Sequence, residues 1–287
     1  MTIRENAYAK LNLSLDITGR REDGYHEMVM VMQTVSLCDE LELRFGGEGV
    51  RAHSNLHFIP SDERNLAVRA ARRYLCAVGE EESALEIALH KHIPVGAGMG
   101  GGSADAAAVL RALNRAFDDR LSGTELTALA REIGSDVAFC LTGGTMLATG
   151  RGEKLTRLPE LPPCCFAIVK PGFCISTPEL FRRMDSAPLR VHPDTAGLLA
   201  ALEQGSLPEL CRRMYNVFED VDDRRMRTIR LIKGRLLDCG AMGALMTGTG
   251  SAVFGVFADR ESALACCAEL KEEFGFARAA EPVGRLL

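Results

Sequence analysis

Residues 94–104 read Pro94-Val95-Gly96-Ala97-Gly98-Met99-Gly100-Gly101-Gly102-Ser103-Ala104. This stretch lies between an apolar segment at 85–90, typical of a strand, and an alanine-rich segment whose apolar residues recur at helical spacing. Glycine lets the backbone approach an anion closely, and the N-terminus of a helix offers free N–H groups and the positive end of its dipole. A flexible surface turn is the alternative, but five glycines joined to a periodic helix predict a phosphate-binding loop that includes all these residues.

Two other nucleotide loops do not fit this stretch. Gly96, Gly98 and Gly101 satisfy the dinucleotide pattern, and acidic residues follow at 118–119. In a dinucleotide-binding fold that acid ends a second strand, whereas 111–130 reads as helix, polar turn and helix. A Walker loop needs Gly-Lys-Ser or Gly-Lys-Thr, and the sequence contains neither.

A phosphate loop without its own lysine requires positive charge and an activator of the nucleophile from elsewhere in the chain. Lys10 and Asp136 are the candidates. The segment 8–17 alternates apolar and polar residues like a half-buried strand, which places Lys10, Asn12 and Ser14 on one face. A lysine there also suits a plain exposed face, and Asp136, which precedes an apolar run, also suits a helix N-cap.

Composition restricts the class of protein. The chain has 287 residues, 47% of them apolar, and a net charge of −5. The length suggests about two domains, and the charge lacks the basic footprint of a nucleic-acid binder. The N-terminal residues are too charged for a signal peptide and no apolar run reaches spanning length, so we expect a cytoplasmic protein with no membrane partner.

Cysteine and histidine spacing gives no sign of a metal centre. The ten cysteines are scattered without any C-x-x-C, which is typical of reduced and mostly buried thiols. His90 and His92 share one face of the segment at 85–92, but no third ligand follows at a suitable spacing. We therefore expect no metal site made of protein side chains alone.

The remaining periodicity predicts an α+β protein. Strands are expected at 29–35, 40–45, 85–90, 166–169 and 252–257. Helices are expected at 65–77, after the glycine loop, and at 124–133, 178–184, 194–203, 206–214, 222–238 and 262–274. Prolines within 159–163 break the pattern, so we place a domain boundary near residue 155, between domains at 1–155 and 156–287.

Five motifs together carry a resemblance to a known family. They are Lys10-Leu11-Asn12-Leu13, Asp23-Gly24-Tyr25-His26, the glycine loop, Gly134-Ser135-Asp136-Val137 and Thr247-Gly248-Thr249-Gly250-Ser251. In this order they resemble the GHMP kinase superfamily over nearly the whole chain. Tyr8 and Ala138 stand where prolines are common in the family, but neither departure removes a chemical group.

The resemblance implies a fold and a reaction. The fold is a two-domain GHMP kinase, with an N-terminal ATP-binding domain like domain 2 of ribosomal protein S5 and a ferredoxin-like C-terminal domain that binds substrate. ATP is the implied co-substrate, with Mg²⁺. Asp23-Gly24-Tyr25-His26, taken with Lys10 and Asn12, is similar to the branch that phosphorylates the 2-hydroxyl of 4-diphosphocytidyl-2-C-methyl-D-erythritol in the non-mevalonate (MEP) isoprenoid pathway.

The same resemblance assigns roles to the candidate residues. Asp136 would accept the proton of the hydroxyl, and Lys10 would keep that carboxylate ionised and offset developing charge. Ser103 would lie near Mg²⁺ or a phosphate oxygen, although a helix cap explains this serine equally well. Asn65 and Leu66 would lie near the adenine.

Four residues are implied to hold the acceptor substrate. Asn12 and His26 would bind it by hydrogen bonds, while Tyr25 and Phe181 would offer aromatic faces to the cytosine ring. Phe181 also suits ordinary core packing at a helix start. The turn at 247–251 would abut the phosphate loop, and a simple tight turn before a strand is its alternative.

Two other functions stay open at this level. A homoserine or mevalonate type of GHMP kinase would keep the ATP loop but lack a cytosine pocket, and Tyr25 and His26 distinguish the two. A non-catalytic nucleotide-binding protein is the second alternative, and the presence of both Lys10 and Asp136 argues against it. The oligomeric state is expected to be monomer or homodimer.

Overall fold

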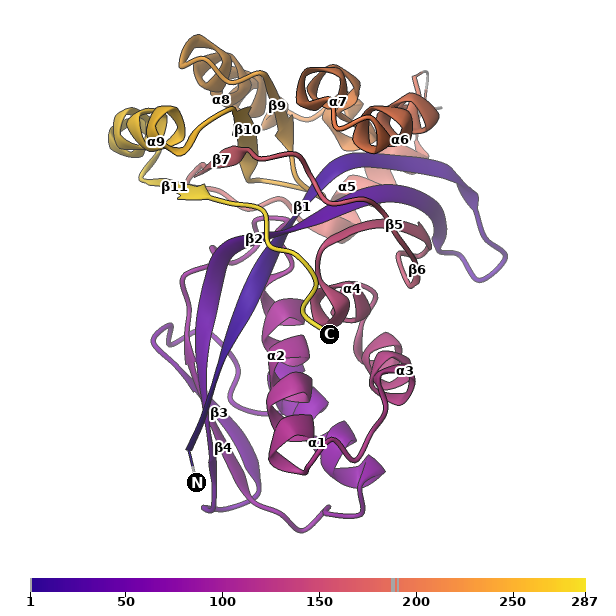
Figure 1. The fold of residues 1–287 in the computed structure, drawn as a ribbon, viewed down its shortest axis with the longest axis vertical. Coiled ribbons are helices and arrows are strands. Elements are labelled where there is room, and N and C mark those ends of the chain that lie inside the picture. Colours follow the sequence, from indigo (N-terminus) through magenta and orange to yellow (C-terminus); the bar gives the residue numbers. More distant parts are fainter. Residues whose placement is uncertain (1, 187–188, 190) are drawn as a thin grey trace.

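The protein is a mixed α+β structure built on two β-sheets (Figure 1). The computed structural model describes residues 2–186, 189 and 191–287. The strands are β1 (Thr2–Arg20), β2 (His26–Phe45), β3 (Val50–Ser54), β4 (Leu85–His90), β5 (Thr145–Gly150), β6 (Lys154–Arg157), β7 (Cys165–Lys170), β8 (Tyr215–Asn216), β9 (Gly243–Met246), β10 (Val253–Phe257) and β11 (Phe276–Ala280). The helices are α1 (Leu66–Ala77), α2 (Gly101–Ala116), α3 (Gly123–Ile133), α4 (Val137–Thr142), α5 (Thr177–Asp185), α6 (Thr195–Glu203), α7 (Leu207–Arg213), α8 (Met226–Asp238) and α9 (Arg260–Phe274), with a 3-10 turn η1 (Val217–Asp220).

The larger sheet is built on the long hairpin of β1 and β2. Its strands follow the order β3-β4-β2-β1-β8, with β5 also paired to β2 and β6 paired to β5. One edge of β2 pairs with β1, and the other pairs with β5 over 28–33 and with β4 over 40–45. The prediction of separate strands at 29–35 and 40–45 was wrong, because β1 pairs with both segments and joins them across its bulges.

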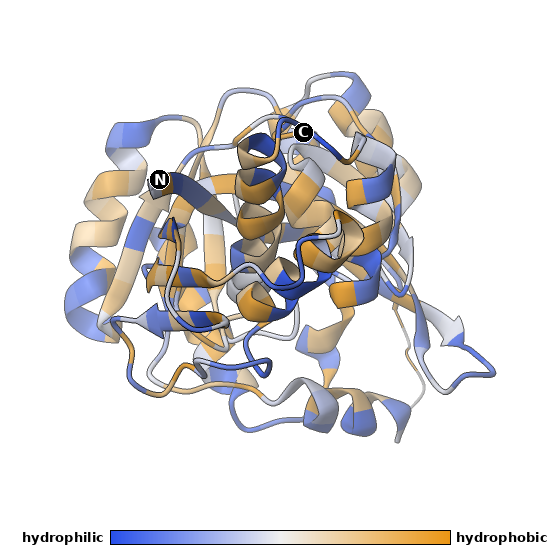
Figure 2. Cartoon of the chain, turned by 90° about the horizontal axis from the view of Figure 1, so that it is seen from below, coloured by the Kyte–Doolittle hydropathy of each residue, from blue (hydrophilic) through white to orange (hydrophobic). Residues whose placement is uncertain are grey.

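Helices α1 to α4 gather on one side of the larger sheet (Figure 1). The parallel strands β3 and β4 are joined through α1, whose predicted range is confirmed and whose N-cap is Asn65. Helix α2 is buried from Ala104 to Asn114, because its alanines let neighbouring elements approach closely. Figure 2 shows apolar and polar residues on the same helices, as expected where one helix face lies against a core.

The smaller sheet is antiparallel, in the order β11-β7-β10-β9. Helices α8 and α9 lie beside it (Figure 1). The strands predicted at 166–169 and 252–257 are confirmed as β7 and β10. Strands β9 and β11 were missed, since Gly243–Met246 and Phe276–Ala280 show no alternation of apolar and polar residues.

Two helices begin elsewhere than the sequence predicts. Helix α8 begins at Met226 instead of 222, because the Asp223 side chain accepts the N–H of Arg225 at 2.8 Å and forms a local turn. Helix α2 begins at Gly101, with Gly100 as its N-cap, so the prediction that Ser103 caps it was wrong. Gly100 has φ +70, a left-handed conformation that turns the loop directly into the helix.

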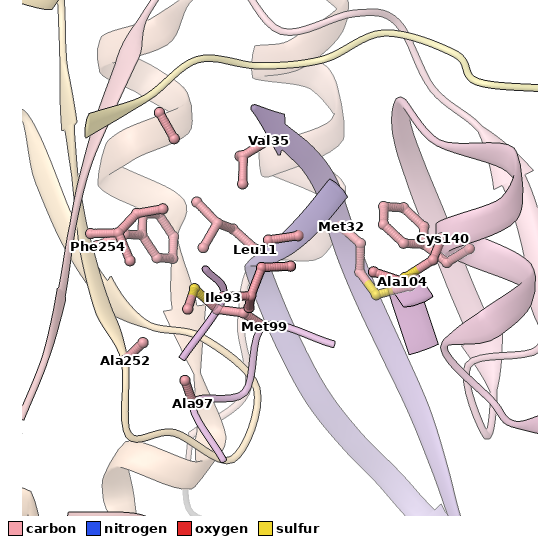
Figure 3. Packing of buried hydrophobic residues seen from close by; sticks show 14 of the residues in the cluster. Leu11, Met32, Val35, Ile93, Ala97, Met99, Ala104, Cys140, Ala252 and Phe254 are labelled. Carbon is pink, nitrogen blue, oxygen red and sulfur yellow. The ribbon is translucent and has the colours of Figure 1, made fainter. Parts of the chain in front are cut away.

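The two sheets share one buried core. Figure 3 shows Leu11 of β1 and Phe254 of β10 among the same buried side chains, and both are fully buried. Strand β8 comes from the second half of the chain yet pairs with β1, and Val35 bridges to Pro282 near the C-terminus. Residue 155 lies inside β6, and the division of the chain there remains a prediction.

Within the described part of the chain, no helix combines the length and the apolar character that crossing a membrane requires.

Candidate active site

The glycine loop joins β4 to α2 with three glycines in the left-handed region. Gly96, Gly98 and Gly100 have φ of +66°, +76° and +70°. A Cβ atom on Gly98 would lie 2.1 Å from the carbonyl oxygen of Thr247, so only glycine fits at that contact. The loop is therefore seated directly on the turn at 247–251.

A cavity of about 640 Å³ opens beside this loop. It brings together most of the side chains outside the loop that the sequence singled out, together with others that it did not. The lining residues are Lys10, Leu15, Gly24, Tyr25, His26, Met28, Met30, Gly98, Gly100, Ser103, Ser135, Asp136, Arg151, Thr177, Pro178, Phe181, Arg182, Asp185, Phe218, Gly248 and Thr249. Within the loop itself, only Gly98, Gly100 and Ser103 reach this cavity.

Lys10 and Asp136 face each other across one end of the cavity. The Nζ atom of Lys10 lies 3.9 Å from Oδ2 of Asp136. The Lys10 side chain is 5% exposed and that of Asp136 is 33% exposed, so the carboxylate is the more accessible of the two. Asp136 precedes α4 but its side chain makes no capping hydrogen bond, which removes the helix cap as its explanation.

Strand β1 buries Lys10 more deeply than a half-buried strand would. Lys10, Asn12 and Ser14 are 4%, 0% and 0% exposed, while Leu11 on the other face is also fully buried. The second face is covered by the glycine loop and the turn at 247–251. A Cβ on Gly100 would lie 3.2 Å from Lys10 Cγ, and one on Gly248 would lie 3.4 Å from Lys10 Nζ. An exposed, snorkelling lysine is thereby excluded.

Asn12 lies behind Lys10 and does not line the cavity. Its Oδ1 accepts from Lys10 Nζ at 2.5 Å, and its backbone N–H donates to Thr247 Oγ1 at 3.0 Å. Full burial leaves the Asn12 amide outside the cavity, and its predicted contact with substrate stays a prediction. Its observed position suits holding the ammonium of Lys10.

Aromatic rings line another part of the cavity. The His26 ring stacks on Phe181 with centroids 4.7 Å apart, and Phe181 meets Phe218 edge-on at 4.9 Å. Tyr25 is 57% exposed and lies under the guanidinium of Arg151, which is 5.0 Å from the ring centroid. The half-exposed Tyr25 ring and the His26–Phe181 stack therefore both line the cavity.

The turn at 247–251 links the two halves of the chain at the cavity. Thr247 Oγ1 lies 3.3 Å from Gly98 O, and Asn216 Nδ2 donates to Met246 O and Gly248 O at 2.7 and 2.8 Å. The hydroxyls of Thr249 and Thr177 are 2.8 Å apart, which joins the turn to α5. These contacts are more than a simple turn before β10 requires.

The residues expected near the adenine have other contacts in the structure. Asn65 is the N-cap of α1, since its Oδ1 accepts the N–H of Ala67 at 3.0 Å. Leu66 lies beside the end of the glycine loop, 3.7 Å from where a Cβ on Gly102 would be. Leu66 also packs against the hydrophobic core, and the placement of both residues near the adenine stays a prediction.

Histidines 90 and 92 lie away from this cavity. Nδ1 of His90 is 3.2 Å from Nε2 of His92, and Glu40 Oε1 is 3.9 Å from the latter. In the ranges that the structure describes, no three His, Cys, Asp or Glu side chains are arranged to hold a metal ion.

Several cavity residues escaped the sequence analysis, among them Arg151, Asp185 and Phe218. Asp185 Oδ1 lies 2.6 Å from Nε2 of His26, although the two are 159 positions apart. Arg151 lies in the turn between β5 and β6, two strands that were not predicted either. No local pattern signals such residues, because only the tertiary fold brings them to the cavity.

Family models, curated relatives and solved structures all place this chain among the GHMP kinases. The family model for the GHMP kinases N terminal domain matches residues 65–144, and that for the GHMP kinases C terminal matches 198–275. A 4-diphosphocytidyl-2-C-methyl-D-erythritol kinase from Syntrophomonas wolfei is 45% identical, with 90% of each chain covered. One from Bacillus velezensis is 45% identical, with 89% of this chain and 88% of the relative covered.

Solved structures agree with these relatives. A crystal structure of 4-(cytidine 5'-diphospho)-2C-methyl-D-erythritol kinase is similar with a TM-score of 0.82 and 35% identity, covering 98% of this chain and 100% of the other. A homoserine kinase from Cytophaga hutchinsonii reaches a TM-score of 0.77 at 23% identity, which shows the shared fold alone, over 99% and 95% of the chains. The predicted two-domain α+β fold is confirmed, and the chain belongs to the GHMP kinase family of ATP-dependent small-molecule kinases.

Proposed function

We propose that this protein transfers the γ-phosphoryl group of ATP to the 2-hydroxyl of 4-diphosphocytidyl-2-C-methyl-D-erythritol, giving the 2-phosphate and ADP in the non-mevalonate isoprenoid pathway. One observation carries the proposal. A single cavity is lined by the phosphate loop, by the Lys10–Asp136 pair and by the aromatic group of Tyr25, His26 and Phe181. The names of the relatives that are 45% identical support the same acceptor.

The Lys10–Asp136 pair supplies the proton transfer. The acceptor hydroxyl gives its proton to the Asp136 carboxylate while its oxygen forms a bond to the γ-phosphorus. The bond from that phosphorus to the β–γ bridging oxygen breaks, and ADP leaves with the electron pair. Lys10, 3.9 Å from Asp136, orients the carboxylate electrostatically and offsets charge on the transferring group. Asn12 holds Lys10 in this position through its 2.5 Å hydrogen bond.

The glycine loop holds the phosphates of ATP. Its left-handed glycines leave the backbone bare, and the free N–H groups at the start of α2 favour an anion. Mg²⁺ fits this end of the cavity, because the Ser103 hydroxyl lines it and Mg²⁺ prefers oxygen ligands shared with substrate phosphates. When bound, Mg²⁺ neutralises part of the phosphate charge.

The aromatic end holds the cytosine. Tyr25 and Phe181 provide faces for the ring, and His26 provides a hydrogen bond to its polar edge. A homoserine or mevalonate acceptor has no aromatic base to place between these rings, so the observed group favours the cytidine-linked acceptor. A non-catalytic role is disfavoured because Lys10 and Asp136 lie together at the cavity. We place the protein in the cytoplasm, as a monomer or homodimer with no nucleic-acid partner.

Product identification tests this proposal. The purified chain is incubated with ATP, Mg²⁺ and 4-diphosphocytidyl-2-C-methyl-D-erythritol, and the products are analysed by mass spectrometry and phosphorus NMR. We expect ADP and a new phosphomonoester on the tertiary 2-hydroxyl, in equal amounts. A phosphate on another hydroxyl, or ADP without a phosphorylated acceptor, would contradict it.

A further inference from the structure

A buried cluster of three charged side chains lies under the phosphate loop, and the proposed phosphoryl transfer does not use it. Lys91, directly after β4, places its ammonium between Asp39 of β2 and Asp105 of α2. The side chains of Lys91, Asp39 and Asp105 are 4%, 0% and 4% exposed. Removing three charges from water is unfavourable, so such a cluster requires good mutual pairing.

The cluster is attached to the chain on both sides of the loop. On the strand side, Asp39 Oδ1 accepts the backbone N–H of His92 at 2.5 Å and that of Ile93 at 2.8 Å. On the helix side, Asp105 Oδ2 accepts from Lys91 Nζ at 2.5 Å. Both ends of the loop are thereby tied to β2, the central strand of the larger sheet.

Lys91 also lies close to the start of α2. A Cβ added at Gly101 would be 3.6 Å from Lys91 Nζ and 3.3 Å from Ile93 Cγ2. The first residue of the helix is therefore in contact with the last residues before the loop. Loop residues 94–100 therefore span two points that this ion cluster contacts.

We propose that Lys91, Asp39 and Asp105 are positioning residues that hold the two ends of the phosphate loop at the separation which nucleotide binding requires. The cluster acts through the loop backbone and does not itself line the cavity. This inference rests on the proposed role of the loop in ATP binding and is independent of which acceptor is phosphorylated.

Two substitutions of Asp105 separate the loss of its charge from the loss of its hydrogen bond. Among the described residues its Oδ1 has no hydrogen-bond partner, and burial raises the pKa of Asp105 to about 7. An amide has the shape of this carboxyl group and carries no charge. Asp105→Asn keeps an oxygen that can accept from Lys91, whereas Asp105→Ala removes the tie between Lys91 and α2.

The same helix offers a matched control. Glu5 of β1 is 12% exposed and pairs with Arg111, at 3.0 Å, and with Arg115, both in the half of α2 away from the loop. Glu5→Ala also removes a mostly buried carboxylate that anchors α2. It leaves the loop ends untouched.

Binding of an ATP analogue to the full-length variants tests the proposal. The affinity for Mg²⁺ and the non-hydrolysable analogue AMPPNP is measured by calorimetry, and thermal unfolding is recorded for each variant. We expect Asp105→Ala to bind at least about tenfold more weakly and Asp105→Asn to bind within about twofold of the unmodified chain. Glu5→Ala should unfold at a lower temperature and yet bind normally. Amide hydrogen exchange of 94–101 without nucleotide should accelerate only in Asp105→Ala.

Normal binding by Asp105→Ala, or equal weakening by Glu5→Ala, would overturn the positioning role. If Asp105→Ala does not fold, Asp39→Asn replaces it, because an amide keeps Oδ1 for the two N–H groups but opposes the ammonium of Lys91. If the unmodified chain binds no nucleotide, the ATP-site proposal fails. Hydrogen exchange of the loop then still decides whether the cluster holds it.

Discussion

Asp136 is the proposed general base, and the structure rules out helix capping as the alternative role of its side chain. Its side chain caps no helix and it faces Lys10 in the cavity. Asp136→Asn should therefore lower kcat by about a hundredfold or more, in keeping with the loss of a general base. Affinity for ATP should change little, because the loop is intact. Single-turnover kinetics and calorimetry measure the two quantities, and near-normal turnover would contradict the assignment.

Asp185 is a second residue whose role can be tested separately. It lies 2.6 Å from His26 Nε2 and fixes the ring that stacks on Phe181. Asp185→Ala should raise KM for the cytidine-linked acceptor by about tenfold and leave KM for ATP unchanged, because only the base end is disturbed. Asp222→Ala is the control, since it removes the same charge from an exposed position nearby. An equal rise in both KM values would place Asp185 in the general fold instead.

At the scale of elements, the phosphate loop depends on one close backbone contact. A Cβ on Gly98 would lie 2.1 Å from Thr247 O, in a backbone with φ +76 that other residues rarely adopt. Gly98→Ala should displace the loop from the turn at 247–251 and raise KM for ATP by about tenfold or more. Gly102→Ala in the same stretch meets its nearest neighbour at 3.7 Å and serves as the control. Comparable KM values for the two variants would show that the contact does not position the loop.

Much of this element could be read from the sequence, because its signal is local. Five glycines between a periodic strand and a periodic helix indicate a phosphate loop from the local sequence alone. The start of α2 at Gly101 was missed, since a left-handed glycine and a serine are both acceptable before a helix.

Elements defined by their partners were harder to predict. Strand β2 was predicted as two strands. In the structure, the edge of β2 away from β1 pairs first with β5 and then with β4. The face of β1 that holds Lys10 and Asn12 is buried, although its polar residues predict an exposed face. Polar side chains occur mostly at protein surfaces, so the sequence pattern is the same in both cases. The contact between His26 and Asp185 joins distant positions and has no sequence signal at all.

At the scale of the whole molecule, stability should depend on pH through Asp223. Its hydrogen bonds with Arg225 hold the pKa of Asp223 near about 2, and Arg183 of α5 lies 3.7 Å away. A carboxyl with a depressed folded pKa contributes stability that is present above its unfolded pKa and is lost as pH falls through the folded value.

The change proposed is Asp223→Asn, with urea unfolding at pH 7, 5, 4 and 3. The variant should be less stable by about 2 kcal/mol at pH 7, and about half of that difference should disappear by pH 3. Asp222→Asn, at the exposed neighbouring position, should show neither effect. A difference that stays constant with pH would mean that packing, rather than the charge of Asp223, is responsible.

The cavity is lined by residues from both halves of the chain, so it is complete only when both halves are folded. Lys10, Asp136 and the glycine loop come from the first half, whereas Phe181 and the turn at 247–251 come from the second. Strand β8 and the residues around Pro282 return to the larger sheet and fix the halves against one another. The cavity is thus one that neither half forms alone.

The most direct measurement is the selectivity of magnesium-dependent ADP release among three acceptors. Purified chain is given ATP with 4-diphosphocytidyl-2-C-methyl-D-erythritol, homoserine or mevalonate, and kcat/KM is determined for each. We predict that the cytidine-linked acceptor exceeds the other two by at least about a thousandfold, because only it can occupy the aromatic end of the cavity. A higher kcat/KM with homoserine or mevalonate would contradict the assignment of Tyr25, His26 and Phe181 and with it the proposed function.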